Sequence, residues 1–177
     1  MPMWLLRLGE FDERLLRAVI GRRRAGLDVL VRLITHLGDA PVAILLAGLL
    51  AVGVYSPLQV PGARAAFALA FSHLLVQLLK RSFSRSRPRL PVGIRSLVHP
   101  PDRFSFPSGH AAAGLSIALS LALSLPLAAG VPVLLLGVAV GMSRCYLGVH
   151  YPGDVVAGWV LAALSVLLAS PFFALFS

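Results

Sequence analysis

The sequence predicts an all-α membrane protein: a bundle of about five to six transmembrane helices, preceded by an amphipathic helix in the membrane interface. Three observations favour this fold. Of the 177 residues, 58% are hydrophobic, whereas soluble domains have about 45–50% apolar residues. The apolar residues gather in long runs of Leu, Ala, Val and Gly. The chain length is typical of one domain, so we expect residues 1–177 to form a single membrane domain.

Residues 3–20 have the pattern of an amphipathic helix. Phe11, Leu15 and Val19 recur every four residues, and charged side chains occupy positions between them. Residues with this spacing share one face of a helix, so one face is apolar and the other is charged. The length and charge fit a helix that lies in the interface rather than one that crosses the bilayer.

The apolar stretch at residues 27–37 is too short to cross a membrane, because a crossing needs about 20 residues. It either lies in the interface or forms one arm of a re-entrant pair with the segment that follows. We therefore expect residues 1–37 to form an interfacial segment. The segments expected to cross the membrane are residues 41–55, 63–79, 109–125, 131–147 and 155–176.

One long polar loop, residues 82–105, interrupts the apolar segments and is rich in Arg and Pro. Consecutive spans cross in opposite directions. The end of segment 63–79, the start of 109–125, the end of 131–147 and the start of 155–176 therefore share one membrane face. Polar residues occupy all four of these ends, so we expect them to converge.

The chain is basic, with 16 Lys and Arg residues, 7 Asp and Glu residues and a formal net charge of +9. Such a balance suits nucleic acid, anionic lipids or a phosphorylated substrate. The arginines lie at the ends of spans rather than on a soluble face, so we expect membrane lipids and no nucleic acid as partners. The single cysteine, Cys145, excludes an internal disulfide and a cysteine-based metal site.

Three polar motifs occupy the converging ends: Lys-x6-Arg-Pro, Pro-Ser-Gly-His and Ser-Arg-x5-His-x3-Asp. Each motif alone is a weak signal, but chance explains their order, spacing and common face poorly. The candidate site residues that they contribute are Lys80, Arg87, Ser108, Gly109, His110, Arg144, His150 and Asp154.

Through these motifs the sequence resembles the type 2 phosphatidic acid phosphatase superfamily. The resemblance covers residues 80–154, the expected catalytic core, and all three signature motifs are complete. It implies a membrane enzyme that removes phosphate from a lipid. It also implies that His150 attacks phosphorus to form a phosphohistidine, while His110 protonates the leaving oxygen.

The residue types agree with phosphoryl transfer. A phosphoryl group in transfer carries charge on three oxygens and needs several preorganised cationic donors. Lys80, Arg87 and Arg144 can supply them. Ser108 and Gly109 stand at an expected helix start, where free N–H groups and the helix dipole favour anions. Because side chains supply the cations, we expect no metal and no cofactor.

The two motif histidines can take different catalytic roles. Histidine titrates near neutrality, so His150 can act as a nucleophile and His110 as a general acid at one pH. Asp154 would hold His150 in the tautomer that exposes its other nitrogen. Pro152 is a natural first residue of the following helix, which puts Asp154 in its first turn.

Two other interpretations are open. Vanadate-dependent haloperoxidases share the constellation, but the resemblance implies that they are larger soluble enzymes, which this membrane chain does not fit. A non-catalytic anion-binding or lipid-transport protein would need the cations but not two histidines and an aspartate. His73 is an ionisable group within a span and therefore a functional candidate; alternatively, it hydrogen-bonds Gln77 one turn further on.

We expect the substrate to be a lipid phosphate or pyrophosphate of the bacterial inner membrane. The candidate classes are undecaprenyl pyrophosphate, used as a polyprenyl carrier, phosphatidylglycerophosphate and phosphatidate. The sequence does not indicate an oligomeric state.

The sidedness of the site rests on two opposing signals. The resemblance implies an active site on the extracytoplasmic face. An odd number of spans would place Arg22, Arg23 and Arg24 on the face of the catalytic loop, which would then be cytoplasmic because positive loops stay inside. A hairpin or an extra crossing within residues 27–55 would remove the conflict. We expect an external site.

Overall fold

The protein is described by a computed structural model covering residues 3–53, 56–100 and 102–173. These residues form helices and no extended strand. The helices are α1 (Met3–Ile20), α2 (Ala25–Thr35), α3 (Ala40–Ala51), α4 (Gln59–Phe83), α5 (Gly109–Ala122), α6 (Leu127–Tyr146) and α7 (Pro152–Phe173), with short 3₁₀ turns η1 (His36–Gly38) and η2 (Ser56–Leu58). An all-helical fold is therefore confirmed.

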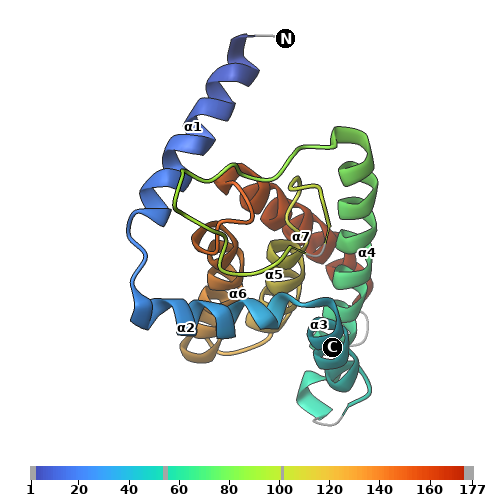
Figure 1. Cartoon of the computed structure of the whole chain (residues 1–177). Helices are drawn as coiled ribbons and strands as arrows, with labels where there is room; N and C mark the ends of the chain where they lie inside the picture. Colours follow the sequence, from blue (N-terminus) through green and yellow to red (C-terminus); the bar gives the residue numbers. More distant parts are fainter. Residues whose placement is uncertain (1–2, 54–55, 101, 174–177) are drawn as a thin grey trace.

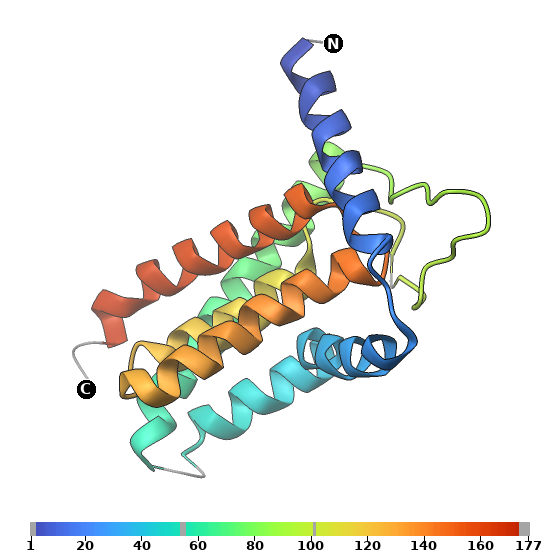
Figure 2. The ribbon, with the colours of Figure 1, turned by 90° about the vertical axis from the view of Figure 1, so that its left-hand side faces the viewer.

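Helices α4 to α7 pack side by side as a bundle, and α3 packs on α4 (Figures 1 and 2). Helix α5 is central, because it contacts α4, α6 and α7. Small residues let the helices approach closely: a side chain at Gly137 of α6 would collide with Ala118 of α5. The start of α5, which carries the second motif, is thus held between its neighbours.

Among the described residues, three helices are long and apolar enough to cross a membrane, namely α4, α6 and α7. Helices α2 and α3, joined through η1, form a pair bent by 58° that is either one broken span or a re-entrant loop, giving up to four. Helix α5 has 14 residues, or about 21 Å, whereas the hydrocarbon core is about 30 Å thick. The predicted count of five to six spans is therefore not confirmed.

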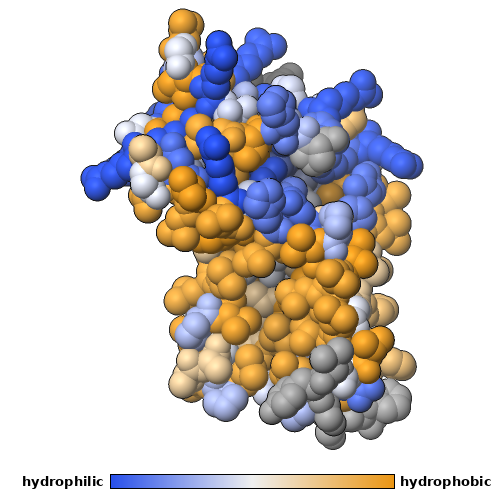
Figure 3. Space-filling view, turned by 60° about the horizontal axis from the view of Figure 1, so that its bottom comes forward, coloured by the Kyte–Doolittle hydropathy of each residue, from blue (hydrophilic) through white to orange (hydrophobic). Residues whose placement is uncertain are grey.

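Hydrophilic side chains gather at one end of the molecule, and hydrophobic ones cover most of the remaining face in Figure 3. Helix α1 has the predicted bounds and projects from the same end as the long loop (Figure 2). It buries Leu16 and Ile20, while Phe11 and Leu15 of the predicted apolar face are exposed. This exposure suits contact with lipid, but the interfacial position of α1 stays a prediction.

Local signals set the helix ends that carry the motifs. Helix α4 stops at Ser84, which adopts a left-handed conformation with φ 47° and donates its N–H to the Lys80 carbonyl at 3.0 Å. Gly148, with φ 78°, reverses the chain after α6. Helix α7 then begins at Pro152, as predicted, with Asp154 in its first turn.

Candidate active site

His150 lies between an arginine and an aspartate. An Nη1 atom of Arg87 lies 3.2 Å from His150 Nε2, and His150 Nδ1 lies 3.5 Å from Asp154 Oδ2. A guanidinium only donates, so Nε2 must accept, and the ring proton is then on Nδ1, facing Asp154. Burial lowers the pKa of His150 to about 4, so the ring is neutral at physiological pH. A neutral ring with a lone pair on Nε2 is the form that a nucleophile needs.

Asp154 is fully buried and its oxygens have further partners. Its Oδ2 accepts from the Tyr151 N–H at 2.9 Å, and its Oδ1 accepts from Arg85 at 2.7 Å. Its backbone carbonyl accepts from the Ser108 N–H at 2.9 Å, which ties the second motif to the third. These contacts fix the carboxylate beside His150.

Arg85 connects this carboxylate to α1. Its second nitrogen donates to Asp12 Oδ2 at 2.7 Å, and Asp12 Oδ1 accepts from the Gly153 N–H at 2.7 Å. Burial alone would lower the pKa of Arg85, but the charges and hydrogen bonds of Asp154 and Asp12 raise it above its usual value. A residue of the N-terminal helix therefore contacts the support of the predicted nucleophile.

Lys80 and Arg87 converge on one carboxylate, that of Asp102. Lys80 Nζ lies 2.6 Å from Asp102 Oδ2, and Arg87 Nη2 lies 2.9 Å from Asp102 Oδ1. Arg87 Nε also donates to the Asp102 carbonyl at 2.8 Å. Burial alone would raise the pKa of Asp102, but the hydrogen bonds and charges of Lys80 and Arg87 lower it below its usual value. Asp102 thus pairs with the two cations that are predicted to bind the phosphate.

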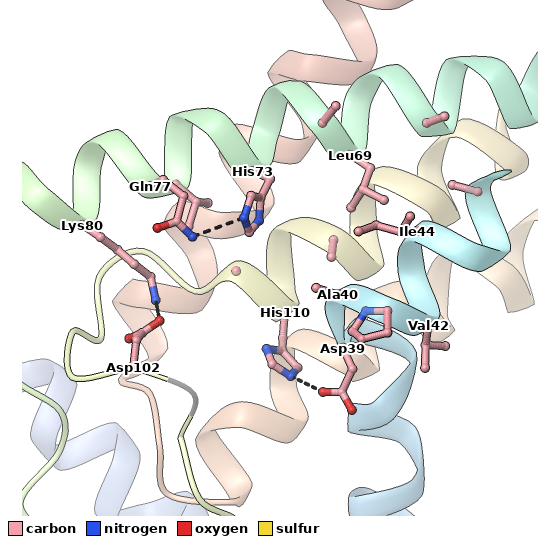
Figure 4. A pocket seen from close by; sticks show the side chains of 18 of the residues that line it. Asp39, Ala40, Val42, Ile44, Leu69, His73, Gln77, Lys80, Asp102 and His110 are labelled. Atoms are coloured by element: carbon pink, nitrogen blue, oxygen red, sulfur yellow. Dashed lines mark hydrogen bonds and ion pairs between the residues drawn. The ribbon is translucent and has the colours of Figure 1, made fainter.

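His110 is held by Asp39, which precedes α3. Its Nε2 lies 2.7 Å from Asp39 Oδ1, and Asp39 Oδ2 lies 2.7 Å from His36 Nδ1. The other nitrogen of His110, Nδ1, points away from Asp39 towards the side of Lys80 and Asp102 (Figure 4). The carboxylate of Asp39 occupies Nε2, so Nδ1 is the nitrogen of His110 that is left to exchange a proton with a ligand.

Arg144 and Ser108, two further residues predicted to bind phosphate, have partners within the protein. Arg144 is buried; its Nη1 donates to Thr35 Oγ1 at 2.7 Å, and no described group accepts from its Nε. Ser108 is buried as the N-cap of α5, where its hydroxyl accepts weakly from the Ala111 N–H at 3.4 Å. Since its own N–H is bonded to Asp154, Ser108 acts in this structure as a helix cap.

A cavity of about 870 Å³ joins these groups to an apolar groove. Arg87, Gly109 and His150 line it together with Lys80, Asp102 and His110, which are labelled in Figure 4. Beyond them the lining comes mainly from small and aliphatic residues of α3 and α4. Within the described part of the chain, no group of three or more His, Cys, Asp or Glu could hold a metal ion.

Five residues that support the motifs were not predicted from the sequence: the carboxylates Asp12, Asp39 and Asp102, and also Arg85 and Thr35. One signal could have found Asp39: the chain has only 7 Asp and Glu residues. In so basic and apolar a chain, an acidic residue beside a predicted helix end has few roles other than pairing with the cations of the site.

Comparison with known proteins decides the family. The family model described as the PAP2 superfamily matches residues 61–176. The chain belongs to this superfamily. The decaprenylphosphoryl-5-phosphoribose phosphatase of Mycobacterium tuberculosis (strain H37Rv) is 34% identical over 146 residues, covering 79% of this chain and 77% of the relative. Phosphatidylglycerophosphatase B of Bacillus subtilis is 31% identical over 176 residues, covering 91% and 82%.

Two solved structures share the fold. Aquifex aeolicus LpxE has a TM-score of 0.77 and 27% identity, over 89% of this chain and 93% of that one. The transmembrane PAP2-type phosphatidylglycerolphosphate phosphatase of B. subtilis has a TM-score of 0.74 and 29% identity, over 97% and 88%. The predicted family is confirmed, and so is the prediction of a phosphatase, because the PAP2 relatives are named phosphatases.

Proposed function

We propose that the chain hydrolyses a lipid phosphomonoester or pyrophosphate through a phosphohistidine on His150. One observation carries the proposal: His150 Nε2 accepts from Arg87 at 3.2 Å and lines the cavity, while Nδ1 faces Asp154. The nucleophilic lone pair is therefore beside a cation that would bind the phosphate. Such a pairing of nucleophile, orienting carboxylate and anion donors is what covalent phosphoryl transfer requires.

The reaction has two steps. First, His150 Nε2 attacks phosphorus, the P–O bond to the lipid breaks, and His110 Nδ1–H gives its proton to the leaving oxygen. Water then attacks phosphorus, the P–N bond to His150 Nε2 breaks, His110 takes a proton from that water, and inorganic phosphate leaves. Lys80, Arg87 and Arg144 balance the charge on the phosphoryl oxygens in both steps. We propose that the Gly109 end of α5 adds backbone donors, with Ser108 holding that end in place.

The groove supports a lipid substrate. It continues from the predicted phosphate site between α3 and α4, where Ala47, Gly48, Ala66 and Leu69 line it. Small and aliphatic residues leave room for a hydrocarbon chain beside the bilayer. We propose an envelope lipid or a polyprenyl carrier of the bacterial inner membrane as substrate, supported by relatives named for decaprenylphosphoryl-phosphoribose and phosphatidylglycerophosphate.

The nucleophile is tested by substituting His150→Ala, with His99→Ala as the matched control. His99 is an exposed histidine of the polar loop that does not line the cavity. We expect the first variant to lose phosphate release from dioctanoyl phosphatidate and to form no acid-labile phosphoenzyme, while the second keeps both. Turnover by His150→Ala would contradict the mechanism. A wild-type protein that binds lipid phosphates without turnover would favour the anion-binding alternative.

We further propose that the site faces the extracytoplasmic side. Arg23 donates to the Tyr146 carbonyl at 2.7 Å and to the Arg95 carbonyl at 2.8 Å, and Arg22 donates to the Ala18 carbonyl at 3.0 Å. These two arginines have structural partners, which weakens them as topology signals.

Sidedness is tested by labelling a cysteine in the polar loop. The exposed loop residue Ser96 is changed as Ser96→Cys, and intact cells are treated with an impermeant thiol reagent. Labelling is expected in this variant but not in the wild type, whose buried Cys145 serves as the control. Protection of the new cysteine in intact cells, with labelling after lysis, would reverse the assignment.

A further inference from the structure

Two polar side chains interrupt the apolar wall of the groove. His73 and Gln77 of α4 point into the cavity (Figure 4), and Gln77 Nε2 lies 3.2 Å from His73 Nε2. Their neighbours on the same wall, Leu69 and Val76, are aliphatic. His73 is exposed and Gln77 is half-buried, so neither is held in a contact between helices. Ionisable and polar groups within an apolar span are functional candidates, and both of these are open to a ligand in the groove.

The pair lies one to two helical turns from the phosphate site. Gln77 and His73 precede Lys80 by three and seven residues, which is about 4.5 and 10.5 Å along the helix axis. A lipid phosphate with its phosphate on Lys80 and its chains in the groove would place the atoms between phosphate and chain against this pair. The pair therefore faces the linker of the substrate rather than the phosphate or the chains.

The hydrogen-bonding capacity of the pair suits a hydroxyl group. An amide nitrogen only donates, so His73 Nε2 accepts and the ring proton is on Nδ1. The mutual bond leaves Gln77 Oε1 as an acceptor and a second amide N–H as a donor. A hydroxyl can use both, whereas a second phosphate offers acceptors only and would call for a cation. The Lys and Arg side chains that line the cavity, Lys80 and Arg87, are both at its phosphate end.

We propose that His73 and Gln77 form a subsite for a hydroxylated linker, so that the preferred substrate is a phosphomonoester on a glycerol or sugar unit with a free hydroxyl, rather than one without that hydroxyl or a diphosphate joined directly to a hydrocarbon chain. The inference rests on the proposed lipid phosphatase function and narrows its substrate class. A site built to hydrogen-bond a hydroxyl discriminates strongly against an analogue that lacks it, because its own polar groups are then left unpaired.

The test compares three substrates in detergent: dioleoyl phosphatidylglycerophosphate, whose terminal glycerol has a hydroxyl beside the reacting phosphate, dioleoyl phosphatidate, and farnesyl diphosphate. The readout is the ratio of kcat/KM for the first substrate to that for each of the others. We expect the wild-type ratio to favour the hydroxylated linker. It should fall about tenfold in Gln77→Leu and further in the His73→Leu/Gln77→Leu double variant. Leu74→Ala, on the exposed outer face of α4, is the matched control and should keep the ratio.

The outcomes separate the two proposals. Equal kcat/KM losses for all three substrates in the variants, or a wild type that prefers farnesyl diphosphate, would overturn the subsite while leaving the phosphatase mechanism intact. No phosphate release by the wild type from any of the three would overturn the lipid phosphatase function and the subsite with it. Size-exclusion chromatography of each variant excludes misfolding as the cause of a changed ratio.

Discussion

Substituting Asp102→Asn should make the protein bind inorganic phosphate and vanadate more tightly. In the structure the Asp102 carboxylate is bonded to Lys80 at 2.6 Å and to Arg87 at 2.9 Å, so an anion must displace it to reach both cations. Charged hydrogen bonds contribute about 1.5–3 kcal/mol when buried, and exposed ion pairs about 0–1 kcal/mol. The Asp102 side chain is 38% exposed. We therefore take about 1.4 kcal/mol, which is a tenfold change in affinity.

The assay is competitive inhibition of phosphatidate hydrolysis by phosphate and by vanadate. The inhibition constants should fall about tenfold in Asp102→Asn. Asp28→Asn is the matched control, because Asp28 bonds the Tyr146 hydroxyl at 2.7 Å and does not line the cavity. A rise in the inhibition constants would refute the reasoning. It would mean that Asp102 holds Lys80 and Arg87 in position for the substrate instead of competing with it.

Three further predictions concern two residues that support the site, Thr35 and Asp12, and the predicted nucleophile His150. Thr35→Val removes the hydrogen bond to Arg144 and should raise KM about fivefold with a smaller change in kcat, as measured by steady-state kinetics. Asp12→Asn removes one of the two carboxylate charges that pair with Arg85. It should lower the unfolding temperature in detergent by about 2–4 °C; an unchanged unfolding temperature would show that this ion pair does not stabilise the fold. Folded His150 has a pKa of about 4, whereas the unfolded chain protonates near pH 6.5 and binds more protons below it. Stability should therefore fall as pH falls from 6.5 to 4, by at most about 3 kcal/mol, and His150→Gln should lose less over this range.

Helix ends that depend on local chemistry could be predicted from the sequence. The starts of α5 at Gly109 and of α7 at Pro152 were expected from the Pro-Ser-Gly-His motif and from a proline suited to the first turn. The expected hydrogen bond between His73 and Gln77 is also present, because residues four apart on a helix meet whatever the tertiary fold is.

The course of the chain around α2 and α3 could not be predicted in the same way. The 58° bend depends on how this pair packs against the bundle, and apolar content does not encode a packing angle. The same holds for α5, whose 14 residues are surrounded by other helices, so their hydrophobicity records burial in protein as well as contact with lipid. Counting apolar runs therefore does not by itself give the number of spans.

The motif residues were predicted, but their carboxylate partners were not, and two of the three partners come from distant parts of the chain. Asp39 is 71 positions from His110, and Asp12 is 73 positions from Arg85. No periodicity links residues at such separations. Only the three-dimensional packing of α1 and α3 against the catalytic end brings them together.

The partners that were missed share one arrangement with a functional consequence. Asp102 pairs with Lys80 and Arg87, Asp39 pairs with His110, and Asp12 shares Arg85 with Asp154. All three lie outside the signature motifs, on α1, before α3 and in the polar loop. Cations that must bind a phosphate repel one another when no anion is present, so each group needs a counter-charge in the ligand-free protein. The motifs thus define what binds phosphate, while carboxylates outside them balance the charge of the site before the substrate arrives. Variation in PAP2 proteins at these outer carboxylates should therefore alter phosphate affinity more than reaction type.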